Sequence, residues 1–348
     1  GGLDSSVISA IAKKYAAKRI ETDGASDAWW PQLHSFAIGL KGAPDLIKAR
    51  EVAEYIGTVH HEINYTVQEG LDAIRDVIYF IETYDVTTVR ASTPMYLLAR
   101  VIKSMGIKMV LSGEGADEVF GGYPWFHRES MLDCGTFPWT PTLAPRKSLL
   151  NADFANTLRM EDYVKNAYDR AVSEVDILPM ENETETSRRR IGYLSIRFFM
   201  QTLLNRMDRT SMNTGLEARV PFADKQLVSY VFNIPWEMKA KGGLVKNILR
   251  QSAVGLLPDE ILFRKKSPYP KTYNPYYENL LSARLKEVLS DGSSPLLPLL
   301  DHTAVQKFLD NPKDYGQPWY GQLMAGPQMT AYLLQIHYWL TEYHVTIL

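Results

Sequence analysis

A strand that runs straight into a glycine-rich acidic loop is the most informative stretch of this chain: 107-IKMVLSGEGADEVFGGY-123. Its apolar first part predicts a buried strand over Ile107–Ser112, and the carboxylates of Glu114, Asp117 and Glu118 follow at once. Ligands of parallel α/β sheets bind beyond the carboxyl ends of the strands. Asp117 is therefore a candidate Mg²⁺ ligand. Glu114 is a candidate base, or a group that orients a nucleophile. A solvated acidic turn without a binding role is the weaker interpretation of this loop.

The first six residues, GGLDSS at Gly1–Ser6, form a second glycine-rich loop directly before a helix. One face of that helix is predicted to be apolar: Val7, Ile8, Ile11, Ala12 and Tyr15. Backbone N–H groups at a helix N-terminus bind phosphate, to which the Ser5 and Ser6 hydroxyls can donate. Asp4 would repel a phosphate unless Mg²⁺ lay between them. Judged alone, the stretch is equally consistent with a turn and helix cap.

Strand-like and helix-like segments alternate over the first 120 residues. We predict strands at 34–40 and 59–65 and helices at 44–56, 67–84 and 93–106. This order indicates an α/β fold, with a parallel sheet flanked by helices. Three loops then converge at one sheet edge: GGLDSS, the end of SFAIGL, and 112–123. We divide the chain into this core at 1–123, a loop-rich segment of loops and short helices at 124–187, and a mainly helical part at 188–348.

Two later segments add cationic and hydroxyl side chains. Lys246 and the pair Lys265–Lys266 offer positive charge at two places, as pyrophosphate release and a tetrahedral oxyanion require, although most lysines are solvated surface charges. The segment ETYDVTTVRASTP surrounds Arg90 with threonines. An arginine in this setting can hold a substrate carboxylate, and a capped helix start with a salt-bridged arginine is an equally good interpretation.

Other polar residues are assigned structural roles. His60 and His61 are neighbours on one predicted strand and point to opposite faces, so they cannot chelate one metal ion together. The arginines of RRRIGYLSIRFFMQTLLNRMDR share a predicted helix with apolar residues, and we assign them to its outer face.

Composition limits the classes of function. The 348 residues are 45% hydrophobic and 22% charged, as in an ordinary globular protein, with a net charge of -2 that favours neither nucleic acid nor an anionic membrane. No stretch is apolar enough to span a membrane. A single cysteine, Cys134, forms no internal disulfide, which suits a reducing compartment, so we expect a cytoplasmic protein.

Taken together, the motifs resemble the synthetase domain of glutamine-dependent asparagine synthetases. The resemblance rests on Gly1–Ser6, on Ser112–Tyr123, on EARVPF at Glu217–Phe222, and on Lys246 with Lys266. It covers nearly the whole chain. It implies an ATP pyrophosphatase fold (PP-loop, adenine nucleotide alpha-hydrolase-like) with a mainly helical C-terminal part.

The resemblance also implies roles for individual residues. It assigns ATP and pyrophosphate binding to these: Gly1, Gly2, Asp4, Ser5, Ile38, Ser112, Gly113 and Lys246. Asp4 and Asp117 match Mg²⁺ ligands, and Glu114 and Lys266 match catalytic residues. Aspartate binding is assigned to the segment with Thr87, Thr88 and Arg90. Glu118 matches an acid near the ammonia entrance.

The implied reaction is ATP-dependent synthesis of asparagine from aspartate and ammonia through β-aspartyl-AMP. In the family, ammonia comes from a glutaminase domain whose first residue is a nucleophilic cysteine. Cys134 lies mid-chain, unlike that residue, so we expect the glutaminase domain and a supporting strand to precede Gly1 in the natural protein. The sequence leaves the oligomeric state open, including a homodimer.

Three other classes of protein are alternatives to an asparagine synthetase. A β-lactam-forming synthetase uses the same adenylation but closes a ring, and the segment around Arg90 favours aspartate instead. A tRNA-modifying ATP pyrophosphatase would need a basic surface, which the net charge disfavours. A non-catalytic domain would not need Asp4, Glu114, Asp117, Lys246 and Lys266 together, and a truncated, inactive domain stays open as an alternative.

Overall fold

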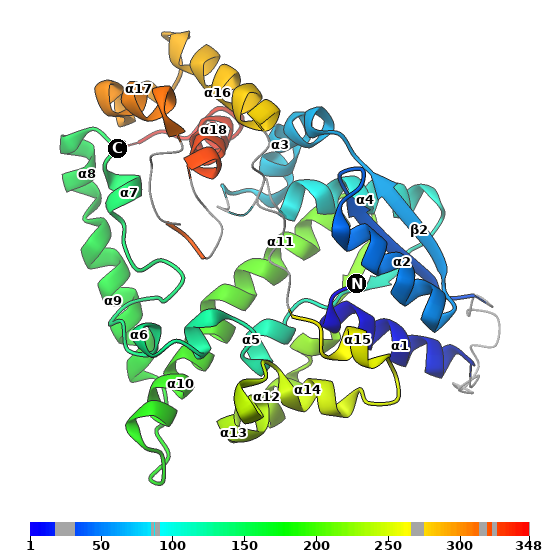
Figure 1. Cartoon of the computed structure of the whole chain (residues 1–348). Helices are drawn as coiled ribbons and strands as arrows, with labels where there is room; N and C mark the ends of the chain where they lie inside the picture. Colours follow the sequence, from blue (N-terminus) through cyan, green and yellow to red (C-terminus); the bar gives the residue numbers. More distant parts are fainter. Residues whose placement is uncertain are drawn as a thin grey trace. The chain divides into compact units, whose positions relative to one another are not determined.

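The computed structural model divides into two compact units (Figure 1). It describes residues 1–17, 32–84, 87, 91–265, 275–312, 319–321 and 326–347. The first unit comprises Gly1–Glu69, Pro94–Tyr123 and Phe199–Pro270. The second comprises Gly70–Thr93, Pro124–Phe198 and Lys271–Leu348. The candidate loops at Gly1–Ser6 and Ser112–Tyr123 both belong to the first unit.

The first unit begins with an alternation of helices and strands. The elements are α1 (Leu3–Ala17), β1 (His34–Gly39), α2 (Pro44–Ile56) and β2 (Val59–Asn64). The strands pair in parallel, with Ile38 opposite Ile63, and α2 packs against both of them (Figure 1). Pro44 stands at the start of α2 because its fixed φ suits a first helical turn, and the helix ends at Gly57 with φ +75°. These predictions from sequence are confirmed.

A second parallel pair carries the acidic loop. It joins β3 (Met109–Leu111) to β4 (Glu217–Arg219), and the flanking helices are α4 (Thr93–Ser104), α5 (Ala116–Phe120) and α11 (Gln201–Met212). Ala99, Ile102 and Leu216 form a buried core with half-buried apolar residues around them. The α/β class with parallel strands is therefore confirmed. Within the described residues the strands form two two-stranded sheets, and β4 was not predicted as a strand because its pairing with β3 spans a long sequence separation.

The predicted apolar face of α1 is wrong in part. Val7 and Ile8 are buried as expected, but Ala10 is buried as well, whereas Ile11 and Tyr15 are exposed. The buried face is thus rotated toward Ser6, Val7 and Ala10, because α1 packs on α2 along that side. Apolar spacing alone did not distinguish the two faces.

Short helices complete the first unit. They are η4 (Pro221–Ala223), α12 (Lys225–Phe232), α13 (Trp236–Lys239), η5 (Lys241–Gly243), α14 (Asn247–Ser252) and α15 (Asp259–Leu262). The Asp224 carboxylate caps α12 by accepting from the backbone N–H groups of Gln226 and Leu227. In GGLVKNILRQSAVGLL, within the part predicted as mainly helical, the α-helix is confined to α14, because Lys246 adopts a left-handed conformation with φ +55° just before it.

The second unit is helical in its described part. Its elements are most of α3 (Val67–Ile81), η2 (Pro124–Phe126), α6 (Glu129–Leu132), α7 (Ala144–Lys147), α8 (Ala152–Leu158), α9 (Met160–Ser173), α10 (Glu183–Leu194), η3 (Ser195–Met200), α16 (Pro275–Ser290), η6 (Leu297–Leu299), α17 (His302–Asp310) and α18 (Gly326–Glu342). Leu281 and Leu285 of α16 are fully buried, and α16 packs against α18. α9 is longer than the short helices predicted there. No described helix combines the length and hydropathy that a bilayer crossing needs.

Candidate active site

The acidic loop after β3 is shaped by glycines and by one serine. The Ser112 backbone N–H donates to the Arg219 carbonyl (2.9 Å), which extends the β3–β4 ladder by one bond, and the Ser112 hydroxyl accepts from the Glu114 N–H (3.3 Å). Gly115 begins α5 with φ +90°, a conformation that a side chain would strain. The loop thus turns sharply out of the strand and places Glu114 and Asp117 within one short segment.

The acidic loop lies directly against the first turn of α1. A Cβ atom built on Gly113 would lie 2.7 Å from the Ser5 backbone nitrogen, so the two chains approach this closely only because Gly113 lacks a side chain. The Gly2 carbonyl accepts from the Ser6 N–H (3.1 Å) and from the hydroxyls of Ser6 (2.6 Å) and Ser5 (3.3 Å). The predicted convergence of these two loops is thus present in the structure.

Lys246 joins both loops through ion pairs. Its Nζ donates to both carboxylate oxygens of Asp4 (2.7 Å each) and lies 2.5 Å from Oδ1 of Asp117. Only 4% of the lysine side chain is exposed. Burial by itself would lower the pKa of this ammonium, but the carboxylates of Asp117 and Asp4 outweigh burial and raise the pKa above its usual value. Lys246 is therefore a charged lysine inside the first unit.

A missing side chain at Gly122 makes room for this ion pair. A Cβ atom there would lie 1.8 Å from Oδ1 of Asp117 and 2.4 Å from Cε of Lys246. Both distances are far below van der Waals contact. A glycine is thus required at Gly122 of SGEGADEVFGGY, because a side chain there would collide with Asp117 and Lys246.

Glu114 is held by an arginine that sequence reasoning assigned to another role. Arg206 of α11 donates from Nη2 to Oε1 of Glu114 (3.0 Å), and 11% of the arginine side chain is exposed. The assignment of the arginines in 188–209 to an outer helix face is therefore wrong for Arg206. A signal was present, because Arg206 is three residues after Leu203 and four before Thr210, and both of these are buried.

Glu118, the residue after Asp117, has a different environment. Its side chain is 2% exposed and accepts a hydrogen bond from the Tyr123 hydroxyl (2.6 Å). Burial, with the nearby charge of Asp117 as a smaller cause, raises the pKa of Glu118 to about 7. This carboxyl group can therefore carry or release a proton near neutral pH.

Two further arginines connect the lysine-bearing segments to the first loop. Arg250 of α14 donates to the carbonyls of Val245 (2.7 Å), just before Lys246, and of Leu262 and Arg264. Arg264 in turn donates to the Gly1 carbonyl (3.1 Å) and to Asp45 at the start of α2 (3.2 Å). The chain two residues before Lys266 is thus fixed beside Gly1. Sequence reasoning missed both arginines.

The remaining predicted residues are placed separately. Ile38 lies next to the last residue of β1, and Thr87, in the second unit, accepts at its carbonyl from the Ala91 N–H (2.9 Å). Lys265 is exposed. Lys266, Thr88 and Arg90 lie outside the described residues. The predicted separation of His60 and His61 is consistent with their partners, since His60 bonds Ser35 and His61 bonds His34.

The metal-binding potential of the site is limited by Lys246. Among the residues that the structure describes, no group of three or more His, Cys, Asp and Glu side chains is arranged to hold a metal ion. Asp4 and Asp117 do face one point, but the Lys246 ammonium lies there. Two carboxylates are enough for Mg²⁺ when phosphate oxygens complete its shell. The pair therefore fits Mg²⁺ if the lysine moves.

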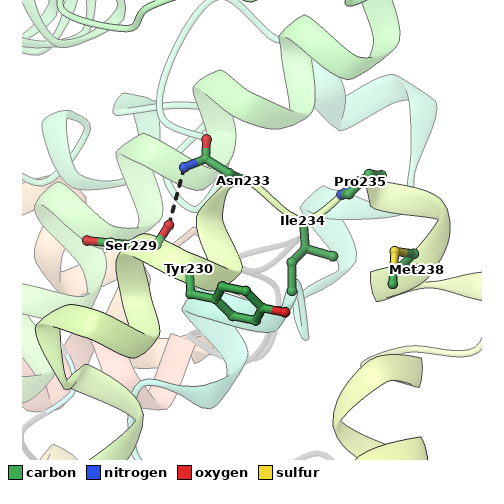
Figure 2. A pocket seen from close by; sticks show the side chains of 6 residues that line it. All are labelled: Ser229, Tyr230, Asn233, Ile234, Pro235 and Met238. Carbon is green, nitrogen blue, oxygen red and sulfur yellow. Dashed lines mark hydrogen bonds between the residues drawn. The ribbon is translucent and has the colours of Figure 1, made fainter.

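A separate surface hollow lies between α12 and α13 (Figure 2). It is lined by Ser229, Tyr230, Asn233, Ile234, Pro235 and Met238. The Asn233 side chain donates to the Ser229 carbonyl (3.2 Å), and Tyr230 and Met238 are exposed. This hollow contains none of the predicted site residues and no charged group, so it is not the candidate active site.

The fold and the site together define a class: a mixed α/β protein with small parallel sheets and two glycine-rich loops that enclose a buried lysine and two aspartates. The chain belongs to the asparagine synthase family, whose sequence model matches residues 1–341. It is 38% identical over 360 residues to asparagine synthetase [glutamine-hydrolyzing] 3 of Bacillus subtilis, across 100% of this chain and 56% of that protein.

Two further relatives agree. Asparagine synthetase B [glutamine-hydrolyzing] of Escherichia coli is 46% identical over 77% of this chain and 39% of its own length. Asparagine synthetase [glutamine-hydrolyzing] 1 of Lotus japonicus is 40% identical over 77% of this chain and 38% of its own length. The chain thus spans roughly four-tenths to just over half the length of these curated relatives. The resemblance inferred from the motifs is confirmed.

Proposed function

We propose that this chain is the synthetase part of an enzyme that makes asparagine from aspartate with ATP. The β-carboxylate oxygen of aspartate attacks the α-phosphorus of ATP, the bond to pyrophosphate breaks, and β-aspartyl-AMP forms. Ammonia then attacks the acyl carbon, loses a proton, and displaces AMP. Family membership supports the proposal, and the observation that carries it is the contact of the Lys246 ammonium with Asp4 and Asp117 between the two loops.

ATP is assigned to the junction of the two loops. Gly1, Gly2, Asp4 and Ser5 would surround the phosphates, where backbone N–H groups of the first turn of α1 are available as donors. Ile38, Ser112 and Gly113 would line the AMP part. Lys246 would stabilise the departing pyrophosphate, because a buried ammonium stabilises developing negative charge strongly.

Mg²⁺ would be held by Asp4 and Asp117. When bound, it would neutralise phosphate charge as pyrophosphate leaves. The support from this chain is the direction of the two carboxylates, which face one point. The ammonium of Lys246 would then turn from these carboxylates to the phosphate oxygens.

Glu114 and Lys266 are the proposed catalytic residues. Glu114 would position the nucleophile or accept its proton, and the Arg206 hydrogen bond to one of its oxygens (3.0 Å) supports a fixed orientation. Lys266 would stabilise the oxyanion formed when ammonia attacks. Two residues earlier in the chain, the Arg264 guanidinium donates to the Gly1 carbonyl of the first loop.

The other substrates are assigned by resemblance. Thr87, Thr88 and Arg90 would bind aspartate, and Glu118 would lie near the ammonia entrance, where a carboxyl group with a pKa of about 7 can exchange a proton. The relatives are named as glutamine-hydrolysing. We accordingly propose that a glutaminase domain of the same full-length, cytoplasmic protein supplies the ammonia.

The test is aspartate-dependent release of pyrophosphate with ATP, Mg²⁺ and ammonium, measured on this chain and on a version extended upstream. In the active form, Lys266→Ala should lower asparagine formation by roughly a hundred- to a thousand-fold, as expected for loss of one preorganised donor. The matched control is Lys265→Ala, which removes the exposed neighbouring lysine and should retain turnover. Near-normal synthesis by Lys266→Ala would reject its assignment, and ring closure of an amino acid without added ammonium would favour a β-lactam-forming synthetase.

A further inference from the structure

The position of the Lys246 ammonium has a consequence for how metal reaches the site. Nζ lies 2.7 Å from both oxygens of Asp4 and 2.5 Å from Oδ1 of Asp117, so it occupies the point at which the two carboxylates converge. Mg²⁺ would need the same point, because it binds carboxylate oxygens at about 2.0–2.1 Å. The lysine and the metal ion therefore compete for one pair of ligands.

Charge prevents the two cations from sharing this pair. An ammonium and a divalent ion a few ångströms apart repel strongly where water is largely excluded, and the Lys246 side chain is 4% exposed. A metal ion can bind only if the ammonium leaves, and the ammonium can leave only if another anion accepts it. The triphosphate of ATP is such an anion.

The surroundings of Lys246 restrict this movement to its side chain. The Val245 carbonyl just before it is held by the buried Arg250 guanidinium (2.7 Å), which fixes the backbone. Gly122 presents no side chain to Cε of Lys246, where a Cβ atom would lie at 2.4 Å. A movement of the ammonium must therefore come from rotation about the four-carbon stem while the backbone stays in place.

We propose that Lys246 is an internal counter-ion that closes the Asp4–Asp117 pair to divalent metal until a polyphosphate draws its ammonium away. The inference rests on the proposed function, in which both the metal and ATP bind here. It makes Lys246 responsible for the order of binding: metal enters with the nucleotide and not before it. In the nucleotide-free protein the ammonium offsets part of the negative charge of the two carboxylates without any metal.

The experiment is titration of Mn²⁺ into nucleotide-free protein, with free Mn²⁺ measured by electron paramagnetic resonance. Lys246→Met and Lys246→Gln should bind one Mn²⁺ roughly 10- to 100-fold more tightly than wild type, the range expected for loss of a competing charged hydrogen-bond donor. Adding Asp117→Asn to either variant should abolish that binding. Lys165→Met, which removes an exposed lysine paired with Asp169, should bind like wild type.

Three results would overturn the proposal. The first is a wild-type protein that binds Mn²⁺ through Asp117 as tightly without nucleotide as with it, and this measurement stands even if no Lys246 variant folds. The second is no gain in the Lys246 variants. The third is an equal gain in Lys165→Met, which would indicate only a change in net charge. No turnover enters the assay, so a failed ligase assignment and a failed counter-ion assignment are distinguishable.

Discussion

Asp117 and Glu118 are neighbours on α5, yet the protein treats their carboxyl groups in opposite ways. Asp117 lies 2.5 Å from the Lys246 ammonium, so its charge is matched by a buried cation. Glu118 is more deeply buried and accepts a hydrogen bond from the neutral Tyr123 hydroxyl (2.6 Å), and burial raises its pKa to about 7. One residue step along the helix separates a carboxylate kept charged from a carboxyl group that can be neutral.

The difference shows how one short helix can supply two kinds of chemistry. A charged carboxylate suits the binding of a metal ion or an ammonium, whereas a carboxyl group that titrates near neutrality suits proton transfer. Burial alone does not decide between them, because both residues are largely buried. Asp117 has a buried ammonium beside it, whereas for Glu118 burial outweighs the hydrogen bond from Tyr123, which by itself lowers the pKa.

The largest expected effect comes from removing the cation, which makes the environment of Asp117 resemble that of Glu118. Lys246→Met should destabilise the protein by about 3–5 kcal/mol, because it leaves two carboxylates without their buried partner. Urea unfolding in metal-free buffer at pH 7 measures the change.

The matched control for that change is Lys165→Met. Lys165 and Asp169 form a lysine–aspartate pair at the surface, and such pairs contribute about 0–1 kcal/mol. Equal losses of stability in the two variants would contradict the distinction between the buried and the exposed pair.

The second effect is a pH dependence caused by Glu118. Its folded-state pKa of about 7 exceeds the ordinary value of 4.5, so the folded protein binds the proton more tightly than the unfolded chain. Between these two values the contribution of Glu118 to stability falls as pH rises, by up to about 3 kcal/mol in total. Below pH 4.5 both states are protonated, and above pH 7 the loss is complete.

Glu118→Gln tests this sign. The amide oxygen can still accept from the Tyr123 hydroxyl but does not titrate. In metal-free buffer, the variant should match wild type near pH 5 and be more stable near pH 8, measured by urea unfolding at both pH values. A difference between the two proteins that stays constant with pH would argue against the raised pKa.

The smallest expected effect is the loss of stability when the space beside Asp117 is filled. Gly122→Ala places a Cβ atom 1.8 Å from Oδ1 of Asp117, so the carboxylate must shift away from Lys246. We expect a loss of about 1–3 kcal/mol, as for other overpacked sites. Gly292→Ala is the control, since nothing lies within 4 Å of a Cβ atom there, and its stability should remain within about 0.5 kcal/mol of wild type. Equal stability of the two variants would show that Asp117 adjusts freely.

Much of the local structure could be predicted from sequence. Pro44 and Gly57 mark the ends of α2 because proline and glycine favour particular backbone angles, and alternating apolar segments predicted β1 and β2. The glycine-rich loop after β3 was also recognisable, since glycines and acids directly follow a strand. These signals lie within a few residues of the features that they predict.

Contacts between distant residues could not be predicted in the same way. The apolar pattern of α1 did not show which side faces α2, and the short strand at 217–219 has its partner β3 more than a hundred residues earlier. The sequence pattern assigned Arg206 to an outer helix face and gave no role to Arg250. Their roles depend on which carboxylate or carbonyl groups other segments bring near them.

The sequence by itself determined the family, the two glycine-rich loops, and the acids and lysines of the candidate site. These are properties of residue type and spacing. Only the tertiary structure decided that Lys246 lies between Asp4 and Asp117, that Glu114 is held by Arg206, and that burial raises the pKa of Glu118. The physical reason is distance. Ion pairing and desolvation act over a few ångströms, and folding alone sets which charges, separated by up to 242 residues in the chain, come that close.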